Sequence, residues 1–270
     1  MRSDGLIRAS ARVTDHLYRH AYPLYALAYG AYKRVIERHN LRIIQRLVRP
    51  GDCVADVGAN VGYYTAALAR AVGPGGQVWA FEPSPENYDR LARVARRYPS
   101  VHPVPAAAVV RGGTTTLYLS PDLNVDHRTY ATDDARHSVT VPAVALDDVL
   151  PSDTPLSFLK IDVQGGELEA LQGMAMTAAR SPGLTILLEV WPFVHDRFGA
   201  GTPALLHLLA TWGLDPRRIE GDHFGATVHA AELQGSAPDR YFDVLCMRPD
   251  RWAEWSARQP RAPGGGSGQR

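Results

Sequence analysis

The chain has 270 residues, of which 45% are hydrophobic and 21% charged, and its formal net charge is +1 at pH 7. This length suits one large domain or one domain with an appendage, and the apolar fraction excludes a wholly disordered or collagen-like chain. A net charge so close to zero argues against a nucleic-acid-binding domain, which usually carries a strongly basic surface. Only Lys33 and Lys160 are lysines and the other basic residues are arginines, a bias that a GC-rich coding sequence would also produce.

The two cysteines, Cys53 and Cys246, lie far apart in apolar stretches. This placement is typical of buried thiols in a reducing compartment rather than of a disulfide. We find neither a run of about 18 apolar residues nor the apolar core of a secretory signal. We therefore expect a cytoplasmic protein without an integral membrane segment.

Residues 1–50 have a helical periodicity of tyrosines and aliphatic residues beside arginines. We interpret this segment as a helical extension that packs on the main domain. The alternative is a basic amphipathic segment that touches a membrane surface or covers a substrate. A Pro-Gly turn then opens a second unit, residues 51–250, and the Pro/Gly/Ser-rich segment 251–270 is expected to be disordered.

Short apolar runs alternate with helical patterns between residues 51 and 250. The expected strands are Cys53–Val57, Gln77–Phe81, Val101–Val110, Thr114–Leu119, Val139–Ala145, Ser157–Ile161, Leu184–Val190 and Tyr241–Met247. The expected helices are Tyr63–Val72, Pro85–Tyr98, Glu167–Ala179 and Pro203–Trp212. This alternation predicts an α/β fold with a mostly parallel sheet and helices on both faces.

The most informative segment is the loop DVGANVG, residues 56–62, which directly follows the first strand. Ligands of open α/β sheets bind beyond the carboxyl ends of the strands, and glycines there let the backbone approach a ligand closely. The loop lacks the third glycine of a dinucleotide-binding motif, which disfavours a nicotinamide dehydrogenase. Asp56 before Gly58 suits a ligand with a cationic end, such as S-adenosylmethionine, better than a pyrophosphate.

Glu82 follows the second strand directly. A carboxylate at this position can accept hydrogen bonds from both hydroxyls of a ribose. The glycine loop, this acid and the strand–helix–strand context together predict a nucleoside-cofactor site.

Five segments together resemble the FkbM family of S-adenosylmethionine-dependent methyltransferases over roughly residues 50–195. They are DVGANVGYYT, VWAFEPSPENYDRL, VPAVALDDVL, FLKIDVQGGELEALQGM and LLEVW. The resemblance implies a Rossmann-like class I methyltransferase fold with a seven-stranded sheet, and S-adenosyl-L-methionine as cofactor. It also implies methylation of a hydroxyl on a natural product or sugar. The chain departs from the family at Gln164, where Glu is frequent, and at residues 107–111, where AAVVR replaces the more usual Ala-Val-Gly-Asp.

The expected cofactor-binding residues come from the loop, the strand ends and the segment after the third strand. They are Asp56, Gly58, Asn60, Gly62, Tyr63, Glu82, Pro83, Ala107 and Asp162.

Methylation of a hydroxyl needs aligned reactants and a base that takes the proton. The candidates are Asp162 and Glu189, which end adjacent strands, and His127 in a polar loop between Asp126 and Arg128. Contact with the methionine part of the cofactor, or with a divalent cation, is the rival role of the two acids. Because apolar residues follow Glu189, we expect no metal.

Other polar residues of the signature have structural interpretations. We expect Lys160, inside an apolar strand, to pair with Asp147 or Asp148. Glu167 is either a first-turn helix acid stabilised by the helix dipole or a functional residue. A solvated position is expected for His195.

We therefore expect a methyltransferase whose partner is a small-molecule hydroxyl acceptor and not nucleic acid. The oligomeric state stays open, with a homodimer as one option. N-methylation, methylation of a macromolecule and a non-catalytic relative that binds the cofactor are the alternatives.

Overall fold

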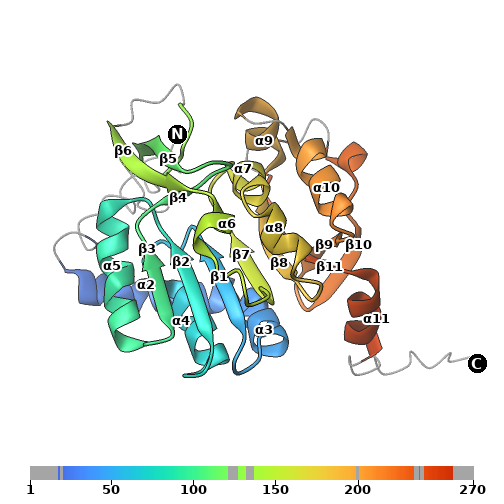
Figure 1. Ribbon diagram of the computed structural model, residues 1–270, viewed down its shortest axis with the longest axis horizontal. Helices are drawn as coiled ribbons and strands as arrows, with labels where there is room; N and C mark the ends of the chain where they lie inside the picture. Colours follow the sequence, from blue (N-terminus) through green and yellow to red (C-terminus); the bar gives the residue numbers. More distant parts are fainter. Residues whose placement is uncertain are drawn as a thin grey trace, which may run out of the picture.

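The computed structural model describes most of the chain, namely residues 18, 21–120, 127–131, 137–198, 201–233, 237 and 240–257. Within this part, an eight-stranded sheet forms the centre of the molecule, in the order β10-β9-β11-β8-β7-β1-β2-β3 (Figure 1). Its strands are β1 (Cys53–Val57), β2 (Gln77–Phe81), β3 (Val101–Val104), β7 (Phe158–Ile161), β8 (Thr185–Val190), β9 (Asp215–Glu220), β10 (His223–Thr227) and β11 (Phe242–Met247).

The strands from β3 to β8 in this order pair in parallel, whereas β11 is antiparallel to both of its neighbours and β10 is antiparallel to β9. The predicted α/β fold with a mostly parallel sheet is confirmed. The expected number of seven strands is wrong for this sheet, because β9 continues through a turn at Gly221 (φ +65°) into the edge strand β10. Neither β9 nor β10 has an apolar run that would reveal it in the sequence.

Helices cover both faces of the sheet because successive strand side chains point to opposite sides. Val54 and Val78 belong to an apolar cluster with residues of four helices, α3 (Arg38–Leu47), α4 (Tyr63–Val72), α5 (Pro85–Arg97) and α11 (Pro249–Ala257). Ala55 and Val57 belong to a second cluster with residues of α6 (Leu146–Val149), α7 (Glu167–Gln172), α8 (Ala175–Ala179) and α10 (Gly201–Thr211). The molecule therefore has three layers (Figure 1).

The chain order reverses on the two sides of β1. From β1 the chain continues outward to β2 and β3, whereas β7 and β8 occupy the other side. The register pairs Val57 with both Phe81 and Ile161, so the three strands end level with one another. Gly58, Glu82 and Asp162 consequently follow these ends at the switch point, where open α/β sheets bind ligands.

A second, three-stranded sheet lies beside the strand ends at the top of Figure 1. Its strands are β4 (Ala107–Ala108), β5 (Gly113–Leu119) and β6 (His137–Val144). The expected strand Val101–Val110 therefore divides, and its second half leaves the central sheet. Pro105 stands at the break, where its missing N–H interrupts strand pairing.

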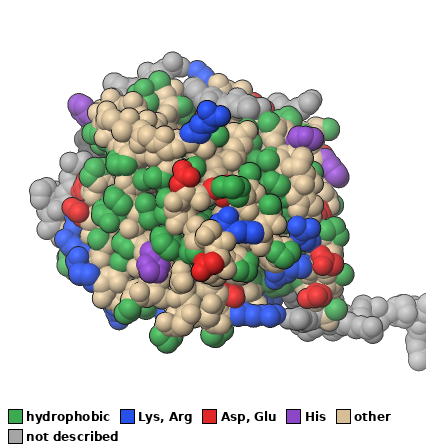
Figure 2. Space-filling view, in the orientation of Figure 1, with side chains coloured by type: hydrophobic (Ala, Val, Ile, Leu, Met, Phe, Trp, Pro, Cys, Tyr) green, Lys and Arg blue, Asp and Glu red, His purple; other side chains and the backbone are tan. Residues whose placement is uncertain are grey.

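The N-terminal extension contains α2 (Tyr22–Ile36) and α3, while residues 1–17, 19 and 20 lie outside the described part of the chain. Helix α11 occupies 251–257 of the segment expected to be disordered, which corrects that boundary. Residues 258–270 are not described. On the face in Figure 2, basic and acidic side chains are interspersed.

Candidate active site

The loop between β1 and α4 needs glycine at its two ends. Gly58 has φ +77°, and a Cβ there would lie 1.9 Å from the carbonyl oxygen of Asp162. Gly62 has φ +86° where α4 begins, and a Cβ would lie 2.9 Å from a methyl carbon of Val94. Left-handed backbone in such close contact is open to glycine alone. The loop backbone can thus pass directly over the ends of β1 and β7.

Glu82 points its carboxyl group back to this loop. Its Oε2 accepts the N–H of Asn60 at 2.8 Å, and its Oε1 accepts the N–H of Ser84 at 2.9 Å. The side chain is buried, and burial raises the pKa of Glu82 to about 7 from an ordinary value of 4.5, although both N–H groups lower it. The carboxylate retains lone pairs that can accept ribose hydroxyls.

A first cavity lies over these strand ends. Most of the expected cofactor-binding residues line it, namely Gly58, Asn60, Tyr63, Glu82, Pro83, Ala107 and Asp162. Tyr29 and Lys33 of the extension, Tyr64 of α4 and Asn87 of α5 also line it, and the sequence analysis missed these four. The first cavity therefore gathers residues from the central sheet, the small sheet and the N-terminal helices.

Asp56 lies beneath the loop, not in this cavity. It is 0% exposed, and its Oδ2 accepts the hydroxyl of Thr65 at 2.6 Å. Its Oδ1 lies 3.8 Å from Nζ of Lys160. Burial raises the pKa of Asp56, while Lys160 and Thr65 lower it. The expected direct contact of Asp56 with a cationic ligand is therefore replaced by a contact with Lys160. Gly62 also lies outside the lining and acts as the helix start.

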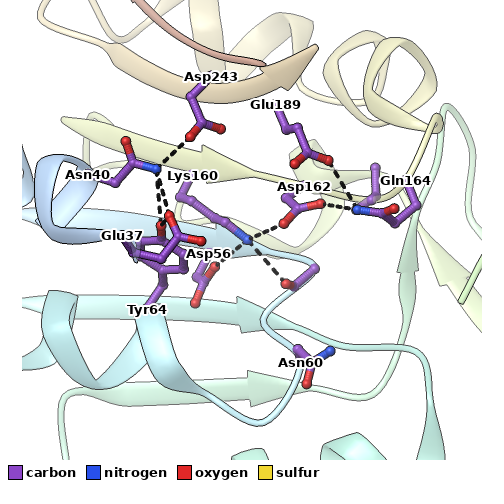
Figure 3. Close-up of polar contacts among 12 residues, drawn as sticks. Glu37, Asn40, Asp56, Asn60, Tyr64, Lys160, Asp162, Gln164, Glu189 and Asp243 are labelled. Carbon is purple, nitrogen blue, oxygen red and sulfur yellow. Dashed lines mark hydrogen bonds and ion pairs between the residues drawn. The ribbon is translucent and has the colours of Figure 1, made fainter. Parts of the chain in front are cut away.

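Lys160 joins the loop to the ends of β1 and β7, as Figure 3 shows. Its Nζ donates to the carbonyl oxygen of Gly58 at 3.3 Å and lies 3.5 Å from Oδ2 of Asp162. Burial lowers the pKa of Lys160, but Asp162 and Asp56 outweigh it and raise the pKa overall. The expected pairing with Asp147 or Asp148 is wrong. Asp147 instead accepts the N–H groups of Met176 and Thr177, at the start of α8.

A second cavity adjoins the first, and four residues line both: Lys33, Tyr64, Lys160 and Asp162. Glu189 lines only the second cavity, together with Glu37, Asn40, Tyr241 and Asp243. Both lysines of the chain thus lie at the junction. The count of lysines was the signal that could have identified Lys33, which the sequence analysis left without a role.

The carboxyl groups of the second cavity have unequal pKa values. Burial, followed by repulsion from Asp162 and Asp243, raises the pKa of Glu189 well above its ordinary value. Burial raises the pKa of Asp243 to about 6, although the Asn40 amide lowers it. For Glu37, burial raises the pKa but Lys33 at 2.6 Å outweighs it and lowers the pKa overall.

The Asn40 amide connects the carboxyl groups of Glu37 and Asp243 on one side of the second cavity (Figure 3). Its Nδ2 lies 2.8 Å from Oδ2 of Asp243 and 3.0 Å from Oε2 of Glu37, and the hydroxyl of Tyr64 donates to the same Glu37 oxygen at 2.6 Å. The extension is therefore bound to β11 and α4 by polar contacts. The extension thus packs on the main domain and also forms one side of the second cavity.

His127 lines the first cavity, and its Nδ1 accepts the N–H of Ser120 at 3.2 Å. It is absent from the lining of the second cavity. Of the three candidate bases, Asp162 and Glu189 therefore line the second cavity together, whereas His127 lines only the first. Its neighbour Asp126 lies outside the described residues.

Glu167 and His195 form a buried pair, with His195 Nε2 at 2.7 Å from Oε2 of Glu167. The Glu167 carboxylate also accepts the N–H groups of Val163 and Gly165 at 2.9 Å. His195, expected in solvent, is 4% exposed in α9 (Pro192–Phe198). Glu167 consequently organises the turn after Asp162.

Among the described residues, no group of three or more His, Cys, Asp or Glu side chains is arranged to hold a metal ion. None of the helices in that part of the chain is both long and apolar enough to cross a membrane.

The family model of the methyltransferase FkbM domain matches residues 56–213, more than half of the chain. The chain belongs to this family. The FkbM chain is similar to the hexuronic acid methyltransferase AglP of Haloferax volcanii, with 29% identity over 142 residues. This match covers 51% of the chain and 56% of AglP, so the chain spans only about half the length of that relative.

Solved structures also resemble this FkbM domain. An rRNA methylase from Streptococcus thermophilus is 12% identical with a TM-score of 0.45, covering 78% of this chain and 94% of that one. A SAM-dependent O-methyltransferase from Thermotoga maritima is 14% identical with a TM-score of 0.41, covering 76% and 68%.

The cofactor implied by the family, S-adenosyl-L-methionine, fits the residues of the first cavity. Glu82 presents a carboxyl group for hydroxyl donors, and Gly58, whose backbone lies against the Asp162 carbonyl, also lines the cavity. Asp162 also lines this cavity, where a carboxylate can face a cationic group. This set of donors and acceptors matches a nucleoside joined to a cationic amino-acid part.

Proposed function

We propose that this chain is an S-adenosyl-L-methionine-dependent methyltransferase that methylates a hydroxyl of a small molecule, either a natural product or a sugar. The observation that carries this proposal is that two cavities meet at Asp162 and Lys160. The first cavity would hold the methyl donor and the second the acceptor. Such an arrangement brings two reactants together over one carboxylate.

When bound, S-adenosyl-L-methionine would supply an electrophilic methyl group for the acceptor oxygen. Glu82 would hold the ribose hydroxyls, and the Gly58 loop would support the amino-acid part. Asp162 would accept the proton of the acceptor hydroxyl as general base. Lys160, 3.5 Å from Asp162, would hold that carboxylate in place. Asp162 lines both cavities, whereas His127 lines only the first, which favours Asp162 over His127 as the base.

The second cavity favours a neutral acceptor. Glu37, Asp162, Glu189 and Asp243 line it against the two lysines, and each lysine already has a carboxylate within 4 Å. An acidic acceptor would meet like charges there, which is unfavourable in a partly buried site. AglP is named for a hexuronic acid, so we expect this chain to differ from it in acceptor.

A methyl-transfer assay tests the proposal. Isotope-labelled S-adenosyl-L-methionine would be incubated with neutral saccharides, uronic acids and amino sugars, and the labelled product analysed for its O-methyl or N-methyl linkage. We expect O-methylation of a neutral saccharide and at least tenfold less of the matched uronic acid. Preferred methylation of the uronic acid would contradict the acceptor class, and N-methylation would favour an amine acceptor.

We also propose the cytoplasm as the site of action. Cys53 and Cys246 are buried free thiols, which suits a reducing compartment. Fractionation of producing cells tests this, and recovery with exported proteins would contradict it.

A further inference from the structure

The side-chain amide of Gln164 lies between the two carboxyl groups that end β7 and β8. Its Nε2 is 2.7 Å from Oδ1 of Asp162 and 3.2 Å from Oε2 of Glu189, and Figure 3 shows both contacts. An amide nitrogen has two hydrogens, so it can donate to both acceptors at once. The bridge connects the junction of the cavities with the wall of the second.

The backbone at Gln164 is held in an uncommon conformation. Gln164 has φ +56°, which is rare for a residue with a side chain. The following Gly165 has φ +107°, and a Cβ there would lie 2.5 Å from Val194 and 2.9 Å from Tyr130. The N–H groups of Val163 and Gly165 are fixed by Glu167, which His195 contacts in turn. The surrounding residues therefore determine where the Gln164 side chain points.

The bridging side chain must donate hydrogen bonds, as an amide does, because several carboxyl groups surround it. Charged and phenolic groups of neighbouring elements interact with Glu189 or Asp162, namely Asp56 of β1, Lys160 of β7, Glu167 of α7, Asp243 of β11, Tyr241 before it, and Tyr29 and Lys33 of the extension. Glu37 of the extension lines the same cavity as Glu189 and Asp162. A carboxylate in place of the amide would add a third acceptor without a donor.

We propose that Gln164 is a positioning residue whose amide bridge fixes the Asp162 and Glu189 carboxyl groups at the junction of the two cavities. The bridge favours the ionised form of Glu189 and occupies Oδ1 of Asp162, while Oδ2 of Asp162 lies beside Lys160. This inference rests on the proposed function for its catalytic consequence, while its electrostatic consequence can be measured without any acceptor.

The test uses two variants of nearly equal size, Gln164→Met and Gln164→Glu, in the full chain. Carbon-13 NMR of protein labelled at glutamate carboxyl carbons follows the titration of Glu189, with the Glu189→Gln spectrum assigning its signal. Loss of the donor should move the titration midpoint of Glu189 to higher pH by about one unit in Gln164→Met. Gln164→Glu should move it further, because it adds a negative charge as well.

Gln172→Glu is the matched control, since it adds the same charge at an exposed position of α7. Its midpoint should equal that of the wild type. The proposal is overturned if Gln164→Met leaves the midpoint unchanged, or if Gln164→Glu behaves like Gln172→Glu. If Gln164→Met does not fold, the comparison of the Glu189 midpoints in Gln164→Glu and Gln172→Glu tests the proposal.

Kinetics then test the positioning role. With a neutral saccharide that the wild type methylates, kcat of Gln164→Met should fall at least tenfold, while KM for S-adenosyl-L-methionine stays within threefold. An unchanged kcat would overturn the positioning role. If the wild type methylates nothing in the panel, the proposed function fails, and the titration alone decides whether the amide bridge exists.

Discussion

The Lys160 ammonium lies between the carboxylates of Asp56 and Asp162, and this position makes it a residue-scale test of the site. Asp56 has no exposed surface, so its charge depends on Lys160 at 3.8 Å and on the hydroxyl of Thr65. The apolar pattern of β7 predicts that Lys160 is buried and paired. It could not predict the partner, because that depends on the pairing of β7 with β1.

Removing this cation should destabilise the fold. We expect Lys160→Met to lower the free energy of unfolding by about 3 kcal/mol at pH 7, because Asp56 then stays buried without its counter-charge. Urea denaturation measures this. The double variant Lys160→Met/Asp56→Asn is the matched control and should recover most of the loss. Equal stability of the single and double variants would refute the pairing.

Glu82 predicts a dependence of stability on pH. Its pKa is about 7 in the folded protein against an ordinary 4.5, so the folded state binds the proton more tightly between these values. Stability contributed by this group therefore falls as the pH rises from about 4.5 through 7. In the absence of cofactor, the free energy of unfolding of Glu82→Gln relative to that of the wild type should therefore rise by up to roughly 3 kcal/mol between pH 4.5 and pH 8.

Chemical denaturation at several pH values checks this, with Glu86→Gln as the exposed control in α5. A stability difference between Glu82→Gln and the wild type that is the same at every pH would show that Glu82 is not buried as a neutral acid.

At the scale of elements, the β1–α4 loop is the feature that the sequence predicts best. Strand Cys53–Val57 and helix Tyr63–Val72 are found within the predicted bounds, because apolar periodicity and glycine spacing agree there. The predicted helix Glu167–Ala179 instead divides at Gly173, where a Cβ would lie 2.1 Å from the carbonyl oxygen of Val109. That approach comes from the residue after β4, far away in sequence, so local periodicity could not reveal it.

The loop yields a prediction about glycine. Gly58→Ala should lower the free energy of unfolding by at least about 2 kcal/mol and weaken S-adenosyl-L-methionine binding more than tenfold, because a Cβ collides with the Asp162 carbonyl at a positive φ. Thermal denaturation and titration calorimetry measure the two effects. Gly75→Ala, where nothing lies within 4 Å of the added Cβ, is the control. Equal behaviour of the two variants would contradict this geometry.

At the scale of the whole molecule, the site arises where separate parts of the chain meet. Sequence motifs predict most of the residues that line the first cavity, since the signature segments continue past the ends of β1, β2 and β7. The second cavity could not be predicted, because Lys33 of α2, Asn40 of α3 and Glu37 between the two helices reach it only after the extension packs against β11 and α4. The near-neutral net charge of the chain likewise conceals the excess of carboxyl groups in this cavity.

The central claim is that the first cavity binds S-adenosyl-L-methionine through Glu82 and the Gly58 loop. Isothermal titration of S-adenosyl-L-methionine into the wild type and Glu82→Ala at pH 8 tests it most directly. We predict binding at one site per chain and at least a tenfold loss of affinity in Glu82→Ala, with Glu86→Ala unchanged. No binding to the folded wild-type protein, or equal affinity of Glu82→Ala, would contradict the claim.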